Sequence, residues 1–310
     1  MKRLLVNDSL APDAMARLKN TEGIEVDDRK RTQEQLVKDI KQFDAIIVRS
    51  ATKVTKEVIE AGDRLSIIVR AGTGLDNVDV DAAKKRGIKV INTPVANSLS
   101  VAELTIGFMI SMARFIPQGT MSLKEGKWLK KEFKGIELHD STLGIIGIGR
   151  VGQLVAERAL AFGMKVMAYD KYPNVKEELK EKIELLSLDE LLPKSDFITV
   201  HVPLMKETHN LIGEREFEKM KDGVYFVHCA RGGIVDEQAL YNALVSGKVK
   251  AAALDVFEVE PPVDDLRKRL LSLNNVICTP HIGASTIQAQ KRVGEEVVEK
   301  VIAELTGGEN

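Results

Sequence analysis

The sequence TLGIIGIGRVGQLVAERALAFGMKVMAYD occupies residues 142–170 and contains the pattern Gly147-x-Gly149-x-x-Gly152. A short apolar run precedes the glycines, an amphipathic stretch follows them, and a second apolar run ends in Asp170. This order of strand, glycine turn, helix and strand is typical of a dinucleotide-binding unit. The first glycine permits a tight turn, the second lets backbone approach a pyrophosphate, and the third allows close packing of helix and strand.

Asp170 follows Gly152 by 18 residues. A carboxylate at this point can accept hydrogen bonds from both hydroxyls of an adenosine ribose, and it would repel a 2′-phosphate. We therefore expect NAD rather than NADP, with the phosphates at the N-terminus of the helix. Lys171, next to Asp170, would soften this discrimination. The alternative is a structural glycine turn beside an exposed aspartate.

Short β-branched runs alternate with amphipathic segments along the whole chain, which predicts parallel sheets flanked by helices. The strands expected before the glycine pattern are residues 3–8, 45–50, 65–72 and 89–94, with helices near 12–20, 32–40, 55–62 and 78–87. The later strands are expected at 142–149, 165–170, 183–187, 197–203, 224–230, 252–257 and 275–280.

Because the glycine pattern lies in mid-chain, we expect an α/β protein of two doubly wound parallel-sheet domains. Residues 98–282 would form a Rossmann NAD-binding domain, inserted into a flavodoxin-like substrate-binding domain made of residues 1–97 and 283–310. A long apolar helix is expected at 101–116, started by Ser100 with Glu103. Residues 119–140 are polar and predicted to be irregular, and a helix is predicted at 285–305.

The composition excludes several classes of protein. The chain has 310 residues and a net charge of −1, so no basic field favours nucleic acid. It contains no apolar run of about 18 residues and no signal peptide, so neither a membrane span nor secretion is expected. Cys229 and Cys278 lie in apolar runs, which suggests small buried side chains in a reduced, cytoplasmic protein. No cluster of ligands predicts a metal.

Arg231, Glu260 and His281 each follow an apolar run that has the character of a buried strand. The carboxyl ends of parallel strands share one edge, where ligands bind. Interconversion of a 2-hydroxy acid and a 2-oxo acid needs a carboxylate binder and carbonyl polariser, which Arg231 can supply. It also needs a proton carrier near neutral pH, for which His281 is suited, with Glu260 to orient and charge the imidazole. The alternative is a salt-bridged surface trio.

Other polar residues are weaker candidates. His201 and His228 fall in strand runs, and His139 and His209 fall in polar connections, so packing or surface roles are expected for all four. Asp255, at another strand end, could hold the nicotinamide or its ribose, or could cap a loop.

The first segment has strand-end residues of its own, namely Arg49, Arg70 and Asn97. The loop around Gly72 could offer backbone N–H groups to a substrate carboxylate. A single carboxylate does not need Arg49 and Arg70 in addition to Arg231, so a further negative group such as phosphate is expected on the substrate. The alternative for Arg49 is an ion pair with a nearby aspartate.

The chain resembles the D-isomer-specific 2-hydroxyacid dehydrogenases over nearly its whole length. The resemblance rests on VRSATKVT (48–55), RAGTGLDNVD (70–79), NTPVANSLSVAELT (92–105), LGIIGIGRVG (143–152), DFITVHVPL (196–204), CARGGIVDE (229–237), ALDVFEVEPP (253–262) and PHIGAST (280–286). The N-terminal stretches point to the branch of the family that acts on phosphoglycerate.

The resemblance implies NAD-dependent oxidation of 3-phospho-D-glycerate to 3-phosphooxypyruvate, the first step of serine biosynthesis, by a homodimer or larger homo-oligomer. It implies Arg231, Glu260 and His281 as catalytic residues, and it assigns substrate binding to Arg49, Arg70, Gly72, Thr73, Asn97, Arg231 and His281. The implied NAD contacts are Thr73, Gly147, Gly149, Arg150, Val151, Gly152, Asp170, His201, Val202, Pro203, Thr208, Cys229, Ala230, Arg231, Asp255, His281, Gly283 and Ala284.

Two departures from the family pattern stand out. Val202 precedes Pro203 where relatives often carry a small hydroxyl residue, and the chain ends after one helix where many relatives continue into serine-binding regulatory domains. A short-form or trimmed enzyme is therefore expected. The alternative functions are another D-2-hydroxyacid dehydrogenase, such as a glyoxylate or hydroxypyruvate reductase, and a non-enzymatic NAD-sensing module of the corepressor kind.

Overall fold

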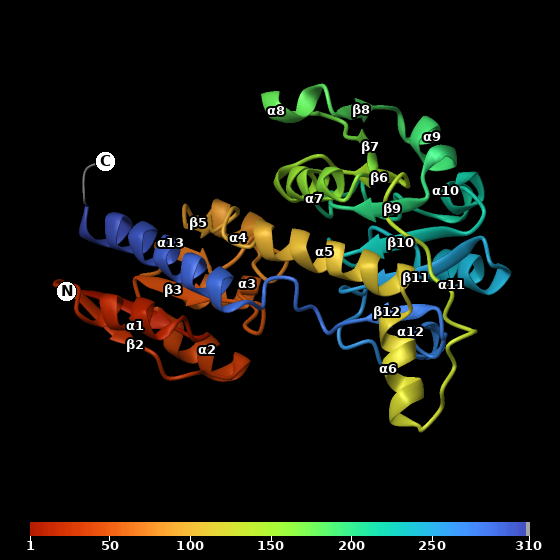
Figure 1. Ribbon diagram of the computed structural model, residues 1–310. Helices are drawn as coiled ribbons and strands as arrows, with labels where there is room; N and C mark the ends of the chain where they lie inside the picture. Colours follow the sequence, from red (N-terminus) through yellow and green to blue (C-terminus); the bar gives the residue numbers. More distant parts are fainter. Residues whose placement is uncertain (308–310) are drawn as a thin grey trace. The chain divides into compact units, whose positions relative to one another are not determined.

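The computed structural model describes residues 1–307, which form two compact units. The first unit contains residues 1–97 and the chain from 284 onward, and the second contains residues 98–283. Each unit is built on its own parallel sheet with helices around it (Figure 1). The prediction of two parallel-sheet α/β domains is confirmed.

The sheet of the first unit has the order β2-β1-β3-β4-β5, and all its pairs are parallel. This is the flavodoxin-like order of a doubly wound sheet. Its strands are β1 (Lys2–Val6), β2 (Ile24–Asp27), β3 (Ala45–Val48), β4 (Ile67–Arg70) and β5 (Lys89–Asn92). Its helices are α1 (Pro12–Lys19), α2 (Gln33–Asp39), α3 (Lys56–Ala61), α4 (Val80–Lys85) and α13 (Ile287–Thr306).

The C-terminal helix α13 lies beside α1, and both cover one face of this sheet (Figure 1). Val297, Val298 and Val301 are fully buried against Leu4 and other residues of the same core cluster. The two helices approach closely at Gly294, where an added Cβ would lie 2.8 Å from Cβ of Ala14. The last helix therefore completes the core that the first strands begin.

The second sheet has the order β12-β11-β10-β9-β6-β7-β8, again with parallel pairs throughout. Counted from β6, this is the Rossmann order 3-2-1-4-5-6 with one further strand, and its direction reverses between β6 and β9. The strands are β6 (Thr142–Ile146), β7 (Lys165–Tyr169), β8 (Ile183–Leu185), β9 (Phe197–Val200), β10 (Val224–His228), β11 (Val249–Leu254) and β12 (Val276–Cys278).

Helices pack on both faces of this sheet, in two separate core clusters. They are α5 (Ser98–Ala113), α6 (Ile116–Lys124), α7 (Arg150–Ala161), α8 (Glu177–Lys180), α9 (Leu188–Leu191), α10 (Glu214–Lys219), α11 (Glu237–Ser246) and α12 (Asp265–Leu271). Within residues 1–307, no helix alone has the length and apolar character to cross a membrane. The pair α5 and α6, bent by 61°, passes that test together by length and composition.

Several sequence-based expectations differ from the structure. Strand β2 was not predicted, because its four residues IEVD alternate with acidic groups at a sheet edge. Helix α5 starts at Ser98, so Ser100 lies inside it and is not its N-cap. Helix α6 begins at Ile116 and includes residues 119–124, which were expected to be irregular. Cys278 is exposed because it ends the edge strand β12, whereas Cys229 is buried as expected.

Candidate active site

One row of residues marks the end of strand pairing across the second sheet. Ile146 pairs with Val200, Val200 with His228, His228 with Leu254, and Leu254 with Cys278. Directly after this row the chain leaves the sheet, so the loops that follow β6, β9, β10, β11 and β12 all start at the same carboxyl edge. All three residues predicted to be catalytic belong to these loops.

The three glycines of the first loop differ in what surrounds them. A Cβ on Gly147, whose φ is +100°, would lie 2.7 Å from the backbone nitrogen of Val202, and one on Gly152 would lie 2.1 Å from the carbonyl oxygen of Gly147. These two glycines are therefore required by protein packing. Gly149 is exposed and has no protein atom within 4 Å of an added Cβ. The space before Gly149, at the N-terminus of α7, is where a pyrophosphate approaches backbone in this type of turn.

Asp170 connects the end of β7 to the glycine loop. Its Oδ2 accepts a hydrogen bond of 2.9 Å from the N–H of Ile148, and its Oδ1 accepts one of 2.9 Å from the N–H of Tyr172. Each carboxylate oxygen has a second lone pair, and the side chain is only half-buried, so Asp170 can still accept hydrogen bonds from a ligand. Asp170 thus fixes the loop as well as presenting a carboxylate beside it.

His281 and Glu260 form a hydrogen-bonded pair. The Nδ1 atom of His281 lies 2.8 Å from Oε2 and 3.1 Å from Oε1 of Glu260. Burial on its own would raise the pKa of Glu260, but the bond to His281 and the N–H of Phe257 outweigh it and hold this pKa below its usual value. The charge of Arg231 acts in the same direction. Glu260 is consequently a carboxylate at neutral pH, and the Nδ1 atom that faces it carries a proton.

Asp255 holds the loop that carries His281. Its buried carboxylate accepts hydrogen bonds from the hydroxyl of Thr279 (2.5 Å) and from the N–H groups of Ile282 and Gly283 (2.8 Å each). His281 itself has a φ of +53°, a left-handed conformation that costs energy in a non-glycine residue. The contacts of Asp255 stabilise this conformation, so they fit the loop-capping alternative for that residue.

Arg231 lies in the loop after β10 and is half-buried. Its Nη1 donates a hydrogen bond of 2.6 Å to the carbonyl oxygen of Ala230, and its own carbonyl oxygen is 2.8 Å from Nε2 of His228. The loop touches the one that carries Glu260, because a Cβ on Gly232 would lie 2.0 Å from the carbonyl oxygen of Phe257. The second unit thus brings Arg231, Glu260 and His281 into neighbouring loops.

An apolar hollow of about 340 Å³ adjoins Glu260 and His281. Its other lining residues are mostly apolar: Phe257, Pro261, Pro262, Leu271, Cys278, Thr279 and Pro280. Charged groups interact more strongly beside such a surface than in bulk water. The hollow gives the pair an apolar surface on one side, while both side chains remain partly exposed to solvent.

The loop after β9 carries the residues His201, Val202 and Pro203. Burial lowers the pKa of His201 to about 3, so its ring is neutral, and its Nε2 lies 2.9 Å from the hydroxyl of Thr199. The Thr208 hydroxyl donates to the carbonyl oxygen of Pro203 (2.6 Å) and thereby closes this loop. The buried thiol of Cys229, at the end of the next strand, has a raised pKa because burial disfavours its charged form. These side chains shape the edge and remain uncharged.

The remaining predicted contacts belong to the first unit: Arg49, Arg70, Gly72, Thr73, Asn97 and Ala284. The turn at Arg49 is held from both sides, since Asp8 accepts from its N–H (2.7 Å) and Asn77 donates to its carbonyl oxygen (2.6 Å). At Gly72, with φ +144°, a Cβ would overlap Nη1 of Arg70, so the Arg70 side chain lies against this glycine. Both arginines thus stand at the carboxyl ends of neighbouring strands, β3 and β4.

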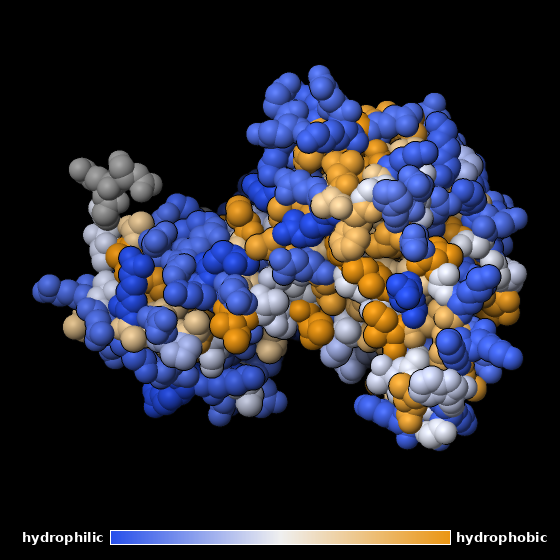
Figure 2. Space-filling model, viewed as in Figure 1, coloured by the Kyte–Doolittle hydropathy of each residue, from blue (hydrophilic) through white to orange (hydrophobic). Residues whose placement is uncertain are grey.

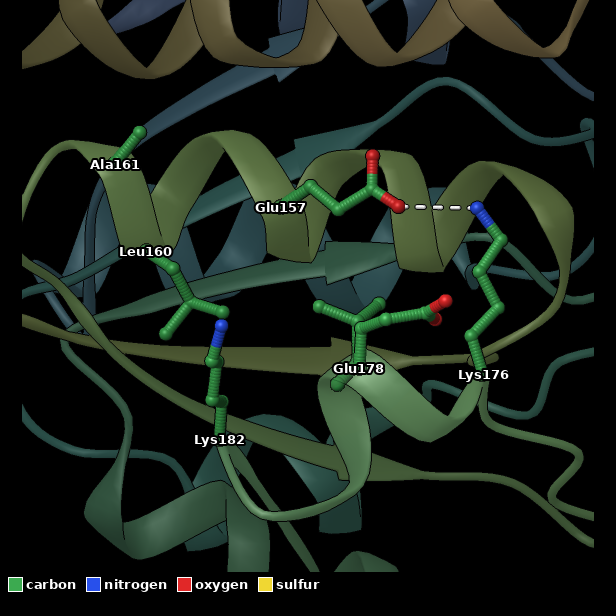
Figure 3. A pocket seen from close by; sticks show the side chains of 7 residues that line it. Glu157, Leu160, Ala161, Lys176, Glu178 and Lys182 are labelled. Atoms are coloured by element: carbon green, nitrogen blue, oxygen red, sulfur yellow. Dashed lines mark hydrogen bonds and ion pairs between the residues drawn. The ribbon is translucent and has the colours of Figure 1, made fainter.

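A second hollow of the second unit, about 840 Å³, lies between α7 and the segment around α8 (Figure 3). Lys176 and Glu157 face each other across it and form an ion pair of 3.1 Å. Glu178 and Lys182 add one further charge of each sign. Because the lining charges balance, we assign no ligand to this hollow.

Comparison with known proteins identifies the family. A family model for the NAD binding domain of D-isomer specific 2-hydroxyacid dehydrogenases matches residues 106–283. The chain belongs to this family. The second unit is therefore the NAD-binding domain of a 2-hydroxyacid dehydrogenase, and NAD is its cofactor, as the glycine pattern predicted.

Relatives within the family carry different names. The chain is 56% identical over 303 residues to the "Hydroxypyruvate reductase" of Thermotoga maritima, covering 98% of both chains. It is 51% identical over 310 residues to the "D-3-phosphoglycerate dehydrogenase" of Methanocaldococcus jannaschii, of whose length it spans 58%. Among solved structures, the D-lactate dehydrogenase of Aquifex aeolicus complexed with NAD and lactic acid is 35% identical, with a TM-score of 0.86 and coverage of 98% and 96%.

The residues of this dehydrogenase fit NAD. Gly149 leaves open the space that a pyrophosphate needs, and the N–H groups at the start of α7 and the carboxylate of Asp170 stand beside that space. In residues 1–307, no group of three or more histidine, cysteine or acidic residues could hold a metal ion.

Sequence reasoning did not single out Glu237 and Arg267, which contact Glu258 in the loop that carries Glu260. Glu237 is 6% exposed and Arg267 is 7% exposed. A signal was present, because Glu237 shares a helical face with Leu240 and Leu244, three and seven residues later. A charge in an apolar stripe indicates a buried partner, but the sequence does not say which residue that partner is.

Proposed function

We propose that this dehydrogenase oxidises 3-phospho-D-glycerate to 3-phosphooxypyruvate with NAD, the first step of serine biosynthesis. The observation that carries the proposed reaction is the hydrogen-bonded pair of His281 and Glu260 at the carboxyl edge of the NAD-binding sheet. Such a pair is suited to moving a proton to or from an oxygen atom beside the cofactor. The choice of substrate is supported by relatives named for phosphoglycerate at 51% and 50% identity.

In the proposed reaction, His281 acts as general base. Since its Nδ1 faces the carboxylate of Glu260, its Nε2 carries the free lone pair and takes the proton from the C2 hydroxyl. NAD, which the glycine loop and Asp170 would hold, would supply the acceptor for the hydride that leaves C2. Arg231 holds the substrate carboxylate and polarises the C2 oxygen through its planar guanidinium. The Glu260 carboxylate stabilises the imidazolium that forms, and in the reverse direction the imidazolium returns the proton.

We propose that residues of the first unit bind the phosphoryl group of the substrate. Arg49 and Arg70, at the ends of β3 and β4, are always charged and bind phosphate oxygens in a fixed geometry. Backbone near Gly72 and Thr73 and the buried side chain of Asn97 are the further substrate contacts that we propose.

A second candidate is hydroxypyruvate reduction by the same residues. It is favoured by the Thermotoga maritima relative, which bears that name and matches 98% of its own length. The chemistry at C2 is the same in both candidates, so they differ only in whether the substrate carries a phosphoryl group.

A substrate panel decides between them. The purified chain would be assayed by NADH absorbance with 3-phosphoglycerate, glycerate, lactate, malate and 2-hydroxyglutarate, and in reverse with hydroxypyruvate and glyoxylate. We expect the highest kcat/KM in the oxidative direction with 3-phosphoglycerate. A higher kcat/KM for glycerate than for 3-phosphoglycerate, with rapid hydroxypyruvate reduction, would establish the second candidate instead.

We further propose that the enzyme is a cytoplasmic homodimer. Apolar side chains are visible on the surface along α5 in Figure 2, and the exposed large apolar residues of α6 and of the segment after it are Ile116, Met121, Leu123, Trp128 and Ile136. Such clusters mark subunit contacts more often than free surface. Sedimentation at several concentrations tests the dimer, and a monomer at micromolar concentration would exclude it.

A further inference from the structure

Three carboxylates of the second unit converge on the buried guanidinium of Arg267, in helix α12. Its Nε lies 2.7 Å from Glu237, its Nη1 lies 2.8 Å from Asp264, and its Nη2 lies 3.0 Å from Glu258. The Arg267 side chain is 8% exposed and that of Glu237 is 6% exposed. Buried charges are costly unless they are paired. Three carboxylates around one guanidinium leave an excess of negative charge, which needs a structural or functional reason.

The cluster is attached to the loop that carries Glu260. The Oε1 atom of Glu237 accepts a hydrogen bond of 2.7 Å from the N–H of Glu258, two residues before Glu260. One residue earlier, the N–H of Phe257 donates a bond of 3.1 Å to Oε1 of Glu260 itself. Two adjacent N–H groups of the segment 257–260 therefore hold the Glu260 carboxylate and the cluster respectively.

The same segment also contacts the loop of Arg231. An added Cβ on Gly232 would lie 2.0 Å from the carbonyl oxygen of Phe257 and 2.5 Å from the nitrogen of Glu258. This loop continues into α11, whose first residue is Glu237. The ion cluster thus closes a ring of contacts in which a displacement of Glu237 or Arg267 moves the backbone next to Glu260.

We propose that Arg267 and Glu237 are positioning residues for Glu260, which they hold in the orientation that pairs it with His281. This inference rests on the proposed function, in which Glu260 orients and charges the catalytic imidazole. Burial raises the pKa of Glu237, and the Glu258 N–H and the charge of Arg267 oppose that rise. The charge of Arg267 therefore favours the ionised form of this buried side chain.

A double-mutant cycle tests the inference, using Arg267→Lys, Glu260→Gln and the double variant in the full chain. Lysine keeps the positive charge, but it lacks the planar guanidinium whose separate nitrogen atoms contact the three carboxylates. We expect Arg267→Lys to lower kcat by roughly 10- to 100-fold because a small misplacement of a catalytic group has this effect. The KM and the Kd for NAD should stay within about twofold, and the acid limb of the kcat–pH profile should move to lower pH, as in Glu260→Gln.

In the Glu260→Gln background, Arg267→Lys should have no further effect on kcat, because the residue through which it acts has already been altered. Arg269→Lys is the matched control, since Arg269 lies on the same helix but is exposed and stacks on Tyr241. We expect wild-type kcat and pH profile for it. If Arg267→Lys does not fold, Glu258→Gln takes its place, because Glu258 is an outer, exposed member of the cluster.

Two results would overturn the inference, and they are distinguishable. Additive losses of kcat in the double variant, or a loss of kcat with an unshifted pH profile, would mean that Arg267 acts on stability alone, while the role of Glu260 stands. Wild-type kcat and pH profile in Glu260→Gln would remove the proposed catalytic role of Glu260 and the positioning role with it.

Discussion

The Nδ1 atom of His281 lies 2.8 Å from Oε2 of Glu260, and this pair is formed by two loops that leave neighbouring strands, β11 and β12, at the same edge. The contact fixes which imidazole nitrogen faces away from the carboxylate. His281 has a left-handed backbone that three hydrogen bonds of Asp255 support. The direction of the ring is thus set by the fold before any substrate binds.

His281→Ala should lower kcat by about 10²- to 10⁴-fold, the usual contribution of a general base, and leave the Kd for NAD within about twofold. The measurement is initial-rate kinetics together with a fluorescence titration of NADH. His139→Ala is the control, because the His139 side chain is 66% exposed and lies outside the site loops. An unchanged kcat in His281→Ala would disprove the assignment.

Asp170→Asn should weaken NAD binding by roughly tenfold and reduce the preference for NAD over NADP, because the charge that repels a 2′-phosphate is lost. Asparagine still accepts a hydrogen bond from the N–H of Ile148, so the glycine loop should persist. Calorimetric titration with both dinucleotides measures the change. Asp189→Asn, on the surface beside Lys219, should leave both affinities unaltered. Equal NAD affinity in Asp170→Asn and the wild type would rule out the ribose contact.

Arg49→Ala should raise KM for 3-phosphoglycerate by roughly 10- to 100-fold, since a charged hydrogen-bond partner of the phosphoryl group is removed. The KM for hydroxypyruvate should change little. Arg64→Ala supplies the comparison, because Arg64 precedes β4 and pairs with Asp44 at the opposite end of the strands. A parallel loss with both substrates would show that Arg49 does not recognise phosphate.

His228→Asn should reduce the acid sensitivity of folding. Burial lowers the pKa of His228 to about 4. An unfolded histidine titrates near pH 6.5, so between about pH 6.5 and pH 4 the unfolded state binds a proton that the folded state does not. Stability is therefore present above this window and is lost as the pH falls through it.

Between pH 7.5 and pH 5.5, the wild type should lose roughly 1 kcal/mol more unfolding free energy than His228→Asn. Asparagine is too short to reach the carbonyl oxygen of Arg231 that Nε2 of His228 contacts, so the comparison uses the change of stability with pH and not its absolute value. Urea unfolding at both pH values measures the difference, with His139→Asn as control. Identical pH dependence in His228→Asn and the wild type would contradict a buried, neutral His228.

Much of the fold, and the placement of the candidate site residues at one sheet edge, was predictable because the signals are local. The strand, glycine turn and helix at residues 142–161 follow one another in the chain, and their spacing is constrained by the turn itself. The prediction that Arg231, Glu260 and His281 meet followed from one rule, that parallel strands deliver their loops to a common edge. The predictions failed where the apolar run was short or lay at the edge of a sheet. Strand β2 was missed, and Cys278 was expected to be buried but is exposed.

Other properties depend on segments that are distant in the chain. Which atom of His281 faces Glu260, which donors Asp255 accepts, and the partners of Arg267 all involve contacts across 20 to 30 residues or between separate helices and loops. A pattern of residue types specifies that a side chain is polar and that a helix face is apolar, but not the direction in which a loop leaves the sheet. The amino-acid pattern therefore predicted the family and the cofactor, and the reacting groups that we propose come from the same pattern. Packing determined their orientation, because hydrogen bonds are made only when the folded backbone brings a donor and an acceptor within about 3 Å.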